Sequence, residues 1–587
     1  MNSTRLRRGA RPAPRTVLLL VLALLRAAVP APAQDISGGA DLAKDITGGA
    51  VGVVKLPKVN RQHNKRPAKP TPTPTPTPTR EPGPSRLQQA SARPVKGSPR
   101  GGGGPKRRTP QPRPQPRPQP KPEVTAEDLN DQGDDFFDQR QFEKAAEAYQ
   151  KAIRLKPNWA EAHNNLGDAY FNLNRYEDAA AAYRQAIRYR PDWAEAHNGL
   201  GDALSNLNRD EEAIAAYRDT LRLKPDDASV HFNLGKLYFG MNRNQEAVAA
   251  LKEAVRYNGS DWEAYNFLGQ AHDRLEQYGP AAEAYNRVVR LNSTYTEVHY
   301  SLGAALYNAG RYEEAIAAYR QATRLKPGAH PDVYNNIGDA YRRLNKLSEA
   351  ADAYKQAILL KQADADTYNS LGFVSTKLTR YSDAIEAYNN ALRLDPNLDE
   401  AYDNLGYALG KSRRWNEAID ALNKAVRLKP DDAEAYTNLG WVYNNTGKFS
   451  EAVGPLSQAV RIQPDYPAAH FNLGIAYSRL GKFAESAEAF GQAVRVKPEW
   501  AEAHNNLGYA YGGQQRWKEA IESHRRAIQL KDDYAGAIFN LGVAYFQSGD
   551  KKQATEQYKI LEKMNPNLGA RLYIMINKKN PPAQGAY

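Results

Sequence analysis

The chain has 587 residues, 25% of them charged and 41% hydrophobic, with a net charge of +14 and no cysteine. The lack of cysteine excludes disulfides, a cysteine nucleophile and a lipid-modified cysteine after an export signal. The charge is unevenly spread, because residues 51–122 hold 17 Lys and Arg against the single acid Glu81, a net +16, whereas residues 123–587 carry −6. A strongly basic first part therefore precedes a weakly acidic main part.

Residues 1–33 have the pattern of a secretory signal peptide. Five arginines between Arg5 and Arg15 precede an apolar run over residues 17–25, and Ala31, Pro32 and Ala33 form a small-x-small cleavage site. The run of nine residues is too short to span a bilayer. The pattern predicts an exported chain, periplasmic or extracellular, cleaved near Ala33. A retained signal anchor is the alternative.

Residues 34–124 are predicted to be a disordered, extended linker. Thr and Pro alternate over residues 71–79, residues 101–104 are all Gly, and Pro alternates with Gln, Arg or Lys over residues 110–122. This composition cannot bury a core and favours polyproline II. We expect a spacer, or a tail whose charge attracts an anionic envelope polymer or lipid. Nucleic acid is not an expected partner, because the basic stretch has no interleaved aromatic residues.

Glycine recurs at a nearly fixed interval over residues 125–568. The steps are 34 residues, with one of 35, and join Gly133, Gly167, Gly201, Gly235, Gly269, Gly303, Gly338, Gly372, Gly406, Gly440, Gly474, Gly508 and Gly542. A fixed period in this range predicts a solenoid in which each unit packs only on its neighbours. We therefore expect 13 stacked repeats.

Each repeat is expected to fold into two helices, A and B. In the second repeat, counted from Ala160 as position 1, Leu166, Tyr170, Tyr183 and Ile187 fall at helical spacing on two short amphipathic segments. The small residues at positions 8 and 20 indicate close helix contact, where a larger residue would overpack.

The residues between repeats predict the helix ends. Pro191 ends helix B, and Asp192 with Glu195 fits a capping box at the start of the next helix A. Residues 567–577 form one more amphipathic segment, which we expect to cap the last repeat, so that residues 569–587 are the remainder of the cap and a tail.

The repeat unit resembles the tetratricopeptide repeat. The residues that carry the resemblance are Leu166 and Gly167 at positions 7 and 8, Tyr170 at 11, Ala179 at 20, Tyr183 at 24, Ala186 at 27 and Pro191 at 32. The resemblance implies an all-α, right-handed superhelical solenoid of about 13 helix hairpins plus a capping helix. It also implies that helix A lines a concave groove for protein or peptide segments.

Position 6, which faces the groove in this family, is Asn in eight repeats. These are Asn165, Asn233, Asn336, Asn404, Asn438, Asn472, Asn506 and Asn540. The row is similar to the asparagine ladder in the repeat arm of O-linked N-acetylglucosamine transferase, where such residues hold a peptide backbone. An amide offers both a donor and an acceptor, so it matches a peptide bond whatever the sequence. The alternative is that Asn merely tolerates this helix face.

Position 9 carries aromatic residues in three successive repeats, as Phe373, Tyr407 and Trp441. If they face the groove, they are candidate anchors for the side chains of a partner. If they face the neighbouring repeat, they are packing residues. The three in succession favour a hydrophobic subsite in repeats eight to ten.

The sequence does not indicate an enzyme. Eight of the ten histidines occupy aromatic positions of the repeat, and single histidines 34 residues apart do not have the spacing of metal ligands. The sequence has no G-x-S-x-G elbow and no counterpart of the transferase's catalytic domain. We expect no catalytic, cofactor or metal site.

The leading functional interpretation is an exported, non-enzymatic scaffold or adaptor that binds extended polypeptide in its groove. One alternative is a structural component of a polymer-export or outer-membrane assembly. The other is an accessory targeting arm for a separate glycosyltransferase. The Arg-, Ala- and Pro-rich composition favours a bacterial source.

Overall fold

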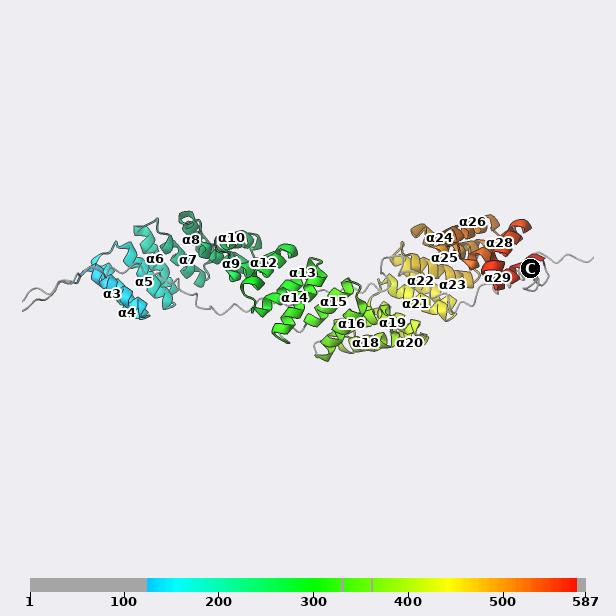
Figure 1. Cartoon of the computed structure of the whole chain (residues 1–587), viewed down its shortest axis with the longest axis horizontal. Helices are drawn as coiled ribbons and strands as arrows, with labels where there is room; N and C mark the ends of the chain where they lie inside the picture. The colour runs from blue at the N-terminus through cyan, green and yellow to red at the C-terminus, as the bar shows by residue number, and fades with distance from the viewer. Residues whose placement is uncertain (1–123, 329–331, 361–362, 578–587) are drawn as a thin grey trace, which may run out of the picture. The chain divides into compact units, whose positions relative to one another are not determined.

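The computed structural model describes residues 124–328, 332–360 and 363–577, which form 27 helices (Figure 1). This part of the chain divides into two compact units, residues 124–298 and 299–577. The predicted signal peptide, the predicted linker up to residue 123 and the tail from residue 578 lie outside the described residues.

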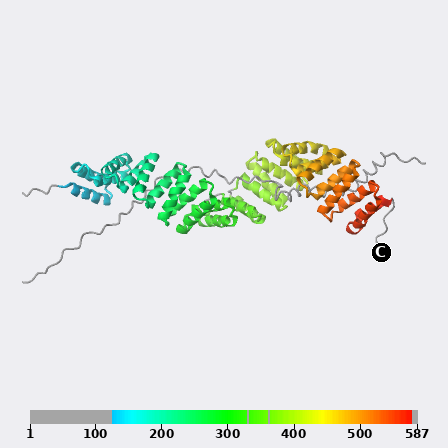
Figure 2. The ribbon, with the colours of Figure 1, turned by 90° about the horizontal axis from the view of Figure 1, so that it is seen from above.

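The first unit contains five helix pairs. Their bounds are α3 (Ala126–Asp138), α4 (Phe142–Leu155), α5 (Ala160–Asn172), α6 (Tyr176–Tyr189), α7 (Ala194–Asn206), α8 (Asp210–Leu223), α9 (Ala228–Gly240), α10 (Asn244–Tyr257), α11 (Trp262–Arg274) and α12 (Tyr278–Leu291). In each pair helix A packs against helix B, and helix B packs against the next helix A. Figure 2 shows the same pairs from above.

The boundary between the units falls in α13, and the second unit continues the pattern. Its helices are α13 (Thr296–Asn308), α14 (Tyr312–Leu325), α15 (Val333–Arg343), α16 (Leu347–Leu359), α17 (Ala365–Lys377), α18 (Tyr381–Leu394), α19 (Asp399–Lys411), α20 (Trp415–Leu428), α21 (Ala433–Asn445), α22 (Phe449–Ile462), α23 (Pro467–Arg479), α24 (Phe483–Val496), α25 (Ala501–Gly513), α26 (Trp517–Leu530), α27 (Ala535–Gln547), α28 (Lys551–Met564) and α29 (Pro566–Asn577). The predicted hairpin solenoid and its capping helix are confirmed, and the superhelical course stays a prediction.

The glycine at position 8 makes room for the side chain at position 24. A Cβ added at Gly167 would lie 2.6 Å from Cε1 of Tyr183, closer than real carbon contacts allow. Tyr183 and Ala179 of α6 are 2% and 0% exposed. The predicted close approach is confirmed, and the partner of the glycine is a tyrosine ring rather than the backbone of the other helix.

The capping box expected at Asp192 and Glu195 is wrong. The N-cap of α7 is Trp193, which has an extended backbone and makes no side-chain capping hydrogen bond. Asp192 therefore lies one residue before the N-cap, too early to cap the helix. Capping boxes occur instead at Thr125 before α3 and at Asp364 before α17, where the polar residue itself is the N-cap.

The turn from helix A to helix B has the same backbone in every repeat. Its position 15 has a positive φ, between 56° and 92°, at Arg140, Asn174, Asn208, Asn242, Glu276, Gly310, Asn345, Thr379, Arg413, Gly447, Gly481, Gln515 and Gly549. Glycine and asparagine adopt this conformation most readily. The other residue types at this position show that the fold imposes the turn.

Candidate functional site

Amides at position 6 bridge successive A helices in the first unit. Asn165 of α5 donates from Nδ2 to Oδ1 of Asn130 at 3.3 Å and to Oδ1 of Asp134 at 3.2 Å, both on α3. Asn233 of α9 likewise donates to Oδ1 of Asp202 on α7 at 3.2 Å. We call the eight asparagines at position 6 the ladder. Two of them, Asn165 and Asn233, therefore hold one repeat to the next.

The same carboxylates accept a hydrogen bond from the tyrosine at position 24. The hydroxyl of Tyr149 donates to Oδ1 of Asp134 at 2.7 Å, and the hydroxyl of Tyr217 donates to Oδ1 of Asp202 at 2.7 Å. Asp134 and Asp202, both at position 9, thus join helix B of their own hairpin to helix A of the following one.

The half-buried setting of Asp202 affects its ionisation. Burial raises the pKa of Asp202 to about 6, against the opposing effect of the hydroxyl of Tyr217. Burial also raises the pKa of Tyr217 well above its ordinary value, and the charge of Asp202 adds to this increase. The neutral phenol therefore remains the donor at physiological pH.

In repeats nine to eleven the ladder is buried more deeply. Asn404 of α19, Asn438 of α21 and Asn472 of α23 are 7%, 7% and 2% exposed. Asn438 donates to Oδ1 of Asp403 at 2.9 Å, and Asn472 donates to the carbonyl oxygen of Ala468 at 2.9 Å. Within the described residues, Nδ2 of Asn404 and Oδ1 of Asn472 have no hydrogen-bond partner. A buried unpaired polar atom costs about 1–3 kcal/mol, so packing alone does not account for these amides.

The remaining ladder residues are half-buried. Asn336 donates to the hydroxyl of Tyr300 at 3.3 Å, Asn506 donates to a carbonyl oxygen of its own helix, and Asn540 donates to Oδ1 of Asn505 at 3.1 Å. These bonds engage Nδ2. Because one amide has two donor hydrogens and two acceptor lone pairs, the carbonyl oxygens keep capacity for a peptide N–H.

The three predicted aromatic anchors differ in exposure. Phe373 of α17 is half-buried, and Nζ of Lys377 lies 5.4 Å from its ring centroid. Tyr407 and Trp441 are only 5% and 2% exposed, with their ring centroids 5.7 Å apart. In this structure Tyr407 and Trp441 are therefore packing residues between neighbouring repeats. Their contact with a partner stays a prediction.

A small neighbour explains the burial of Trp441. A Cβ added at Gly410 of α19 would lie 2.5 Å from Cζ3 of the indole. Trp415 of α20 packs against the same ring edge-on, with centroids 6.2 Å apart. The glycine of one repeat thus accommodates the tryptophan of the next.

Comparison with protein families matches the repeats along both units. Tetratricopeptide repeat models match residues 133–174, 166–228, 210–271, 421–454, 441–481, 471–535 and 535–568. The chain is a tetratricopeptide repeat protein. Repeats of this family bind peptides or proteins. Residues 257–436 also match the model for the C-terminal domain of cilia and flagella-associated protein 70. The likeness to the glycosyltransferase arm stays a prediction.

Several solved structures are similar to this tetratricopeptide repeat protein. Cut9–Hcn1 of the APC/C is 16% identical over 77% of this chain and 96% of that one, with a TM-score of 0.35. Yeast Tom70 is 18% identical over 74% and 99%, with a TM-score of 0.31. YrrB, described as having an unusual peptide-binding site, is 26% identical over 32% and 96%, with a TM-score of 0.30. A search of curated proteins found no match.

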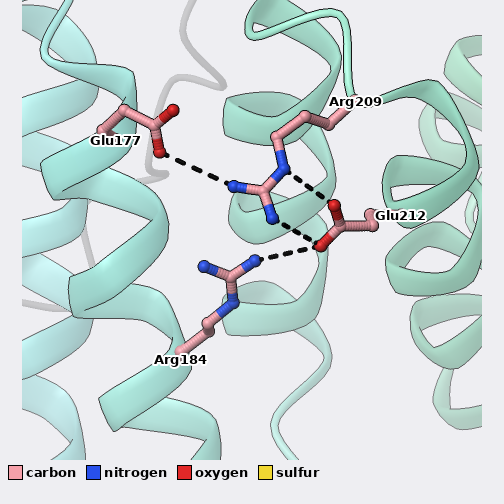
Figure 3. A network of polar contacts seen from close by, with 4 residues as sticks. All are labelled: Glu177, Arg184, Arg209 and Glu212. Carbon is pink, nitrogen blue, oxygen red and sulfur yellow. Dashed lines mark hydrogen bonds and ion pairs between the residues drawn. The ribbon is translucent and has the colours of Figure 1, made fainter.

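The B helices of the tetratricopeptide repeats carry exposed ion pairs. Figure 3 shows Arg209, before α8, bonded to Glu212 at 2.7 Å and paired with Glu177 of α6 at 3.6 Å. Arg184 of α6 reaches the same Glu212 at 3.3 Å. Exposed pairs of this kind contribute little to stability, because solvent screens their attraction. They connect successive B helices without forming a reactive site.

The histidines at position 4 have a structural role that the sequence analysis missed. Nε2 of His163 lies 2.9 Å from the carbonyl oxygen of Pro157, six residues earlier. The contact recurs at His197, His231, His470 and His504. The signal was available, since each of these histidines follows a proline at the same interval.

Two further features bear on the class of function. Among the described residues, no three metal-ligating side chains converge on one point. None of the described helices combines the length and apolar character that a membrane span requires.

Proposed function

We propose that this tetratricopeptide repeat protein is an exported, non-enzymatic scaffold that binds extended polypeptide along its A helices. The partner's backbone would pair with the amides at position 6. Phe373 would contact a partner side chain at the half-buried end of the predicted hydrophobic subsite. The basic segment would meet an anionic envelope polymer or lipid.

The observation that carries the proposal is that hydrogen bonds within the protein hold the ladder amides in place. Hydrogen bonds from Nδ2 hold the amides of Asn165, Asn233, Asn336 and Asn540 against neighbouring A helices, so that little rotamer freedom remains to be lost on binding. A row of fixed amides suits a regular backbone, and each additional hydrogen bond is worth about 0.5–1.5 kcal/mol.

The test begins with peptides selected from a random display library on the immobilised full chain. The dissociation constant of a selected peptide is measured with the wild-type protein and with Asn336→Ala combined with Asn506→Ala. Losing two hydrogen bonds should weaken binding about tenfold. Replacing single peptide amides of the ligand by esters should weaken it too, because the backbone is the group recognised.

The matched control is Asn390→Ala combined with Gln492→Ala, which removes two half-buried amides from the B helices α18 and α24. The control should retain the wild-type dissociation constant. Equal affinity of the A-helix variant and the wild type would contradict the proposal. Export is tested separately, by sequencing the N-terminus of the chain recovered outside the cytoplasm, which should begin after Ala33.

A further inference from the structure

Positive charge is concentrated in one part of the first unit, the C-terminal halves of its B helices. Positions 22–31 of its five repeats hold 13 Lys and Arg against four Asp and Glu, a net +9. Residues 124–298 as a whole hold 20 Lys and Arg against 29 Asp and Glu, a net −9. The rest of the unit therefore carries −18, so positive and negative charges occupy different surfaces.

Two positions on each B helix supply most of these cations, and we call the surface that they form the basic face. They are position 29 and either position 25 or 26, a spacing that places both side chains on one face of the helix. The exposed residues concerned are Lys151, Arg154, Arg184, Arg188, Arg218, Arg222, Lys252, Arg256, Arg287 and Arg290.

Ion pairs show that successive B helices lie side by side. Arg184 of α6 reaches Glu212 of α8 at 3.3 Å (Figure 3), and Arg243, just before α10, pairs with Glu211 of α8 at 3.1 Å. Figure 1 shows α6, α8 and α10 following one another along one side of the first unit. The cations of neighbouring helices therefore belong to one continuous surface.

The fold does not account for all of these cations. A helix dipole favours positive charge only near the last turn, whereas position 25 lies more than a full turn before the helix end. Arg222 and Arg256 pair with acids on their own helices, Asp219 and Glu253. With the described residues, however, no ion pair is made by Lys151, Arg154, Arg188, Lys252, Arg287 or Arg290.

Exposed apolar side chains border the basic face. Position 30, next to each arginine at position 29, holds Leu155, Tyr189, Tyr257 and Leu291, which are 58%, 40%, 41% and 41% exposed. Position 22 shares the face of the cations and is an exposed alanine in α6, α8 and α10, so no long side chain covers them. Arginine beside tyrosine and leucine suits the interface of a bilayer, which offers both anionic groups and an apolar phase.

We propose that the basic face of the first unit binds the surface of an anionic lipid bilayer. Arginine binds a lipid phosphate through two parallel hydrogen bonds, and each cation near such a surface raises the affinity about fivefold. The negative charge on the rest of the unit would be repelled, which fixes the orientation. Because the basic face lies on the B helices, the A helices stay free for a peptide, and the inference goes beyond the proposed function.

The test uses the full chain, whose lack of cysteine allows a single label at an introduced site. A polarity-sensitive dye at Ala215→Cys, on α8 within the basic face, should shift its emission to shorter wavelength on vesicles of phosphatidylcholine and phosphatidylglycerol. Vesicles of phosphatidylcholine alone should give no shift, and raising the salt from about 0.1 M to about 0.5 M should reduce it.

The same dye at Asn206→Cys, exposed at the end of α7, reports on a surface outside the basic face. It should not shift, even where the basic segment 51–122 holds the chain on the vesicle. Equal shifts at the two labelled sites would overturn the proposal, because the chain would then adsorb without a defined face. So would a shift of the same size with dextran sulfate, a polymer that supplies the charge without an apolar phase.

The variant Arg154→Gln, Arg188→Gln, Arg290→Gln removes three cations that make no ion pair with a described residue. It should lower the docking equilibrium about a hundredfold and abolish most of the shift at position 215. A shift equal to that of the unmutated face would contradict the proposal.

The matched control is Arg140→Gln, Lys144→Gln, Lys236→Gln, which removes the same charge from exposed sites outside the basic face. It should retain the shift, and a loss equal to that of the basic-face variant would mean that net charge alone drives adsorption. No peptide is present, so failure here is distinct from failure of peptide binding.

Discussion

At the residue scale, the turn at position 15 shows how a shared backbone constrains single side chains. Thr379 has a φ of 58°, a region that β-branched residues adopt only under strain. Asn174, at the same position of its own repeat, also has a φ of 58°, but asparagine tolerates this region better. The cost of the turn therefore depends on which residue occupies it.

Replacing Thr379 with glycine should stabilise the second unit by about 1 kcal/mol, since the strain of the left-handed backbone is removed. Denaturant unfolding measures the change. The control is Thr555→Gly, in the interior of α28, which should destabilise by about 0.3–0.5 kcal/mol because glycine disfavours a helix more than threonine does. A destabilised Thr379→Gly variant would show that the threonine contributes contacts that outweigh its strain.

At the element scale, the link from Tyr217 to Asp202 to Asn233 should make the first unit sensitive to pH. The folded pKa of Asp202, about 6, exceeds the value near 3.9 of an unfolded aspartate. The native state therefore binds more protons between these values. The stability given by the protonated carboxyl is complete below about pH 4 and is lost as the pH rises through 6.

The wild type should lose unfolding free energy as the pH rises from 4 to 7. Asp202→Asn should lose about 1–2 kcal/mol less over the same range, because the neutral amide does not titrate. Denaturant titrations at the two pH values give the difference. Asp226→Asn, in an exposed loop, should leave the pH profile unchanged. Parallel profiles for wild type and Asp202→Asn would contradict the assignment.

The capping helix gives a second prediction at this scale. Leu572 of α29 is fully buried, and a Cβ added at Gly542 of α27 would lie 2.5 Å from its Cδ2. Leu572→Ala should destabilise the last hairpin by about 2–5 kcal/mol through the cavity it leaves. Hydrogen exchange of α27 and α28 measures this. Ile574→Ala on the same helix, where the side chain is 42% exposed, should cost far less. Equal effects would mean that the cap packs differently.

At the scale of the whole molecule, stability should be local, because each repeat contacts only its neighbours. Leu422 of α20 is fully buried, so Leu422→Ala should raise amide exchange in repeats around the ninth and leave α3 to α6 unchanged. Leu428→Ala, on the same helix but 41% exposed, serves as the control. Uniformly faster exchange along the chain would show that the array unfolds as one cooperative body.

The sequence was sufficient to predict the helices and their pairing, but it did not predict the contacts of every side chain. Gly167 and Tyr183 recur in phase, and their contact is a local property of one hairpin. The start of α7 was misplaced because Trp193 occupies the N-cap, and no propensity favours tryptophan there. The burial of Trp441 depends on Gly410 in the preceding repeat. It could be predicted only by comparing a position in one repeat with a different position in the next.

The uniform turn at position 15 has an evolutionary consequence. Because every hairpin closes with nearly the same backbone, one whole unit of 34 residues can be duplicated or deleted without changing the junctions on either side. Unequal recombination between neighbouring copies would then alter the length of the array in single steps. Copy number is thereby a heritable variable on which selection can act, separately from the identity of the residues that each copy displays.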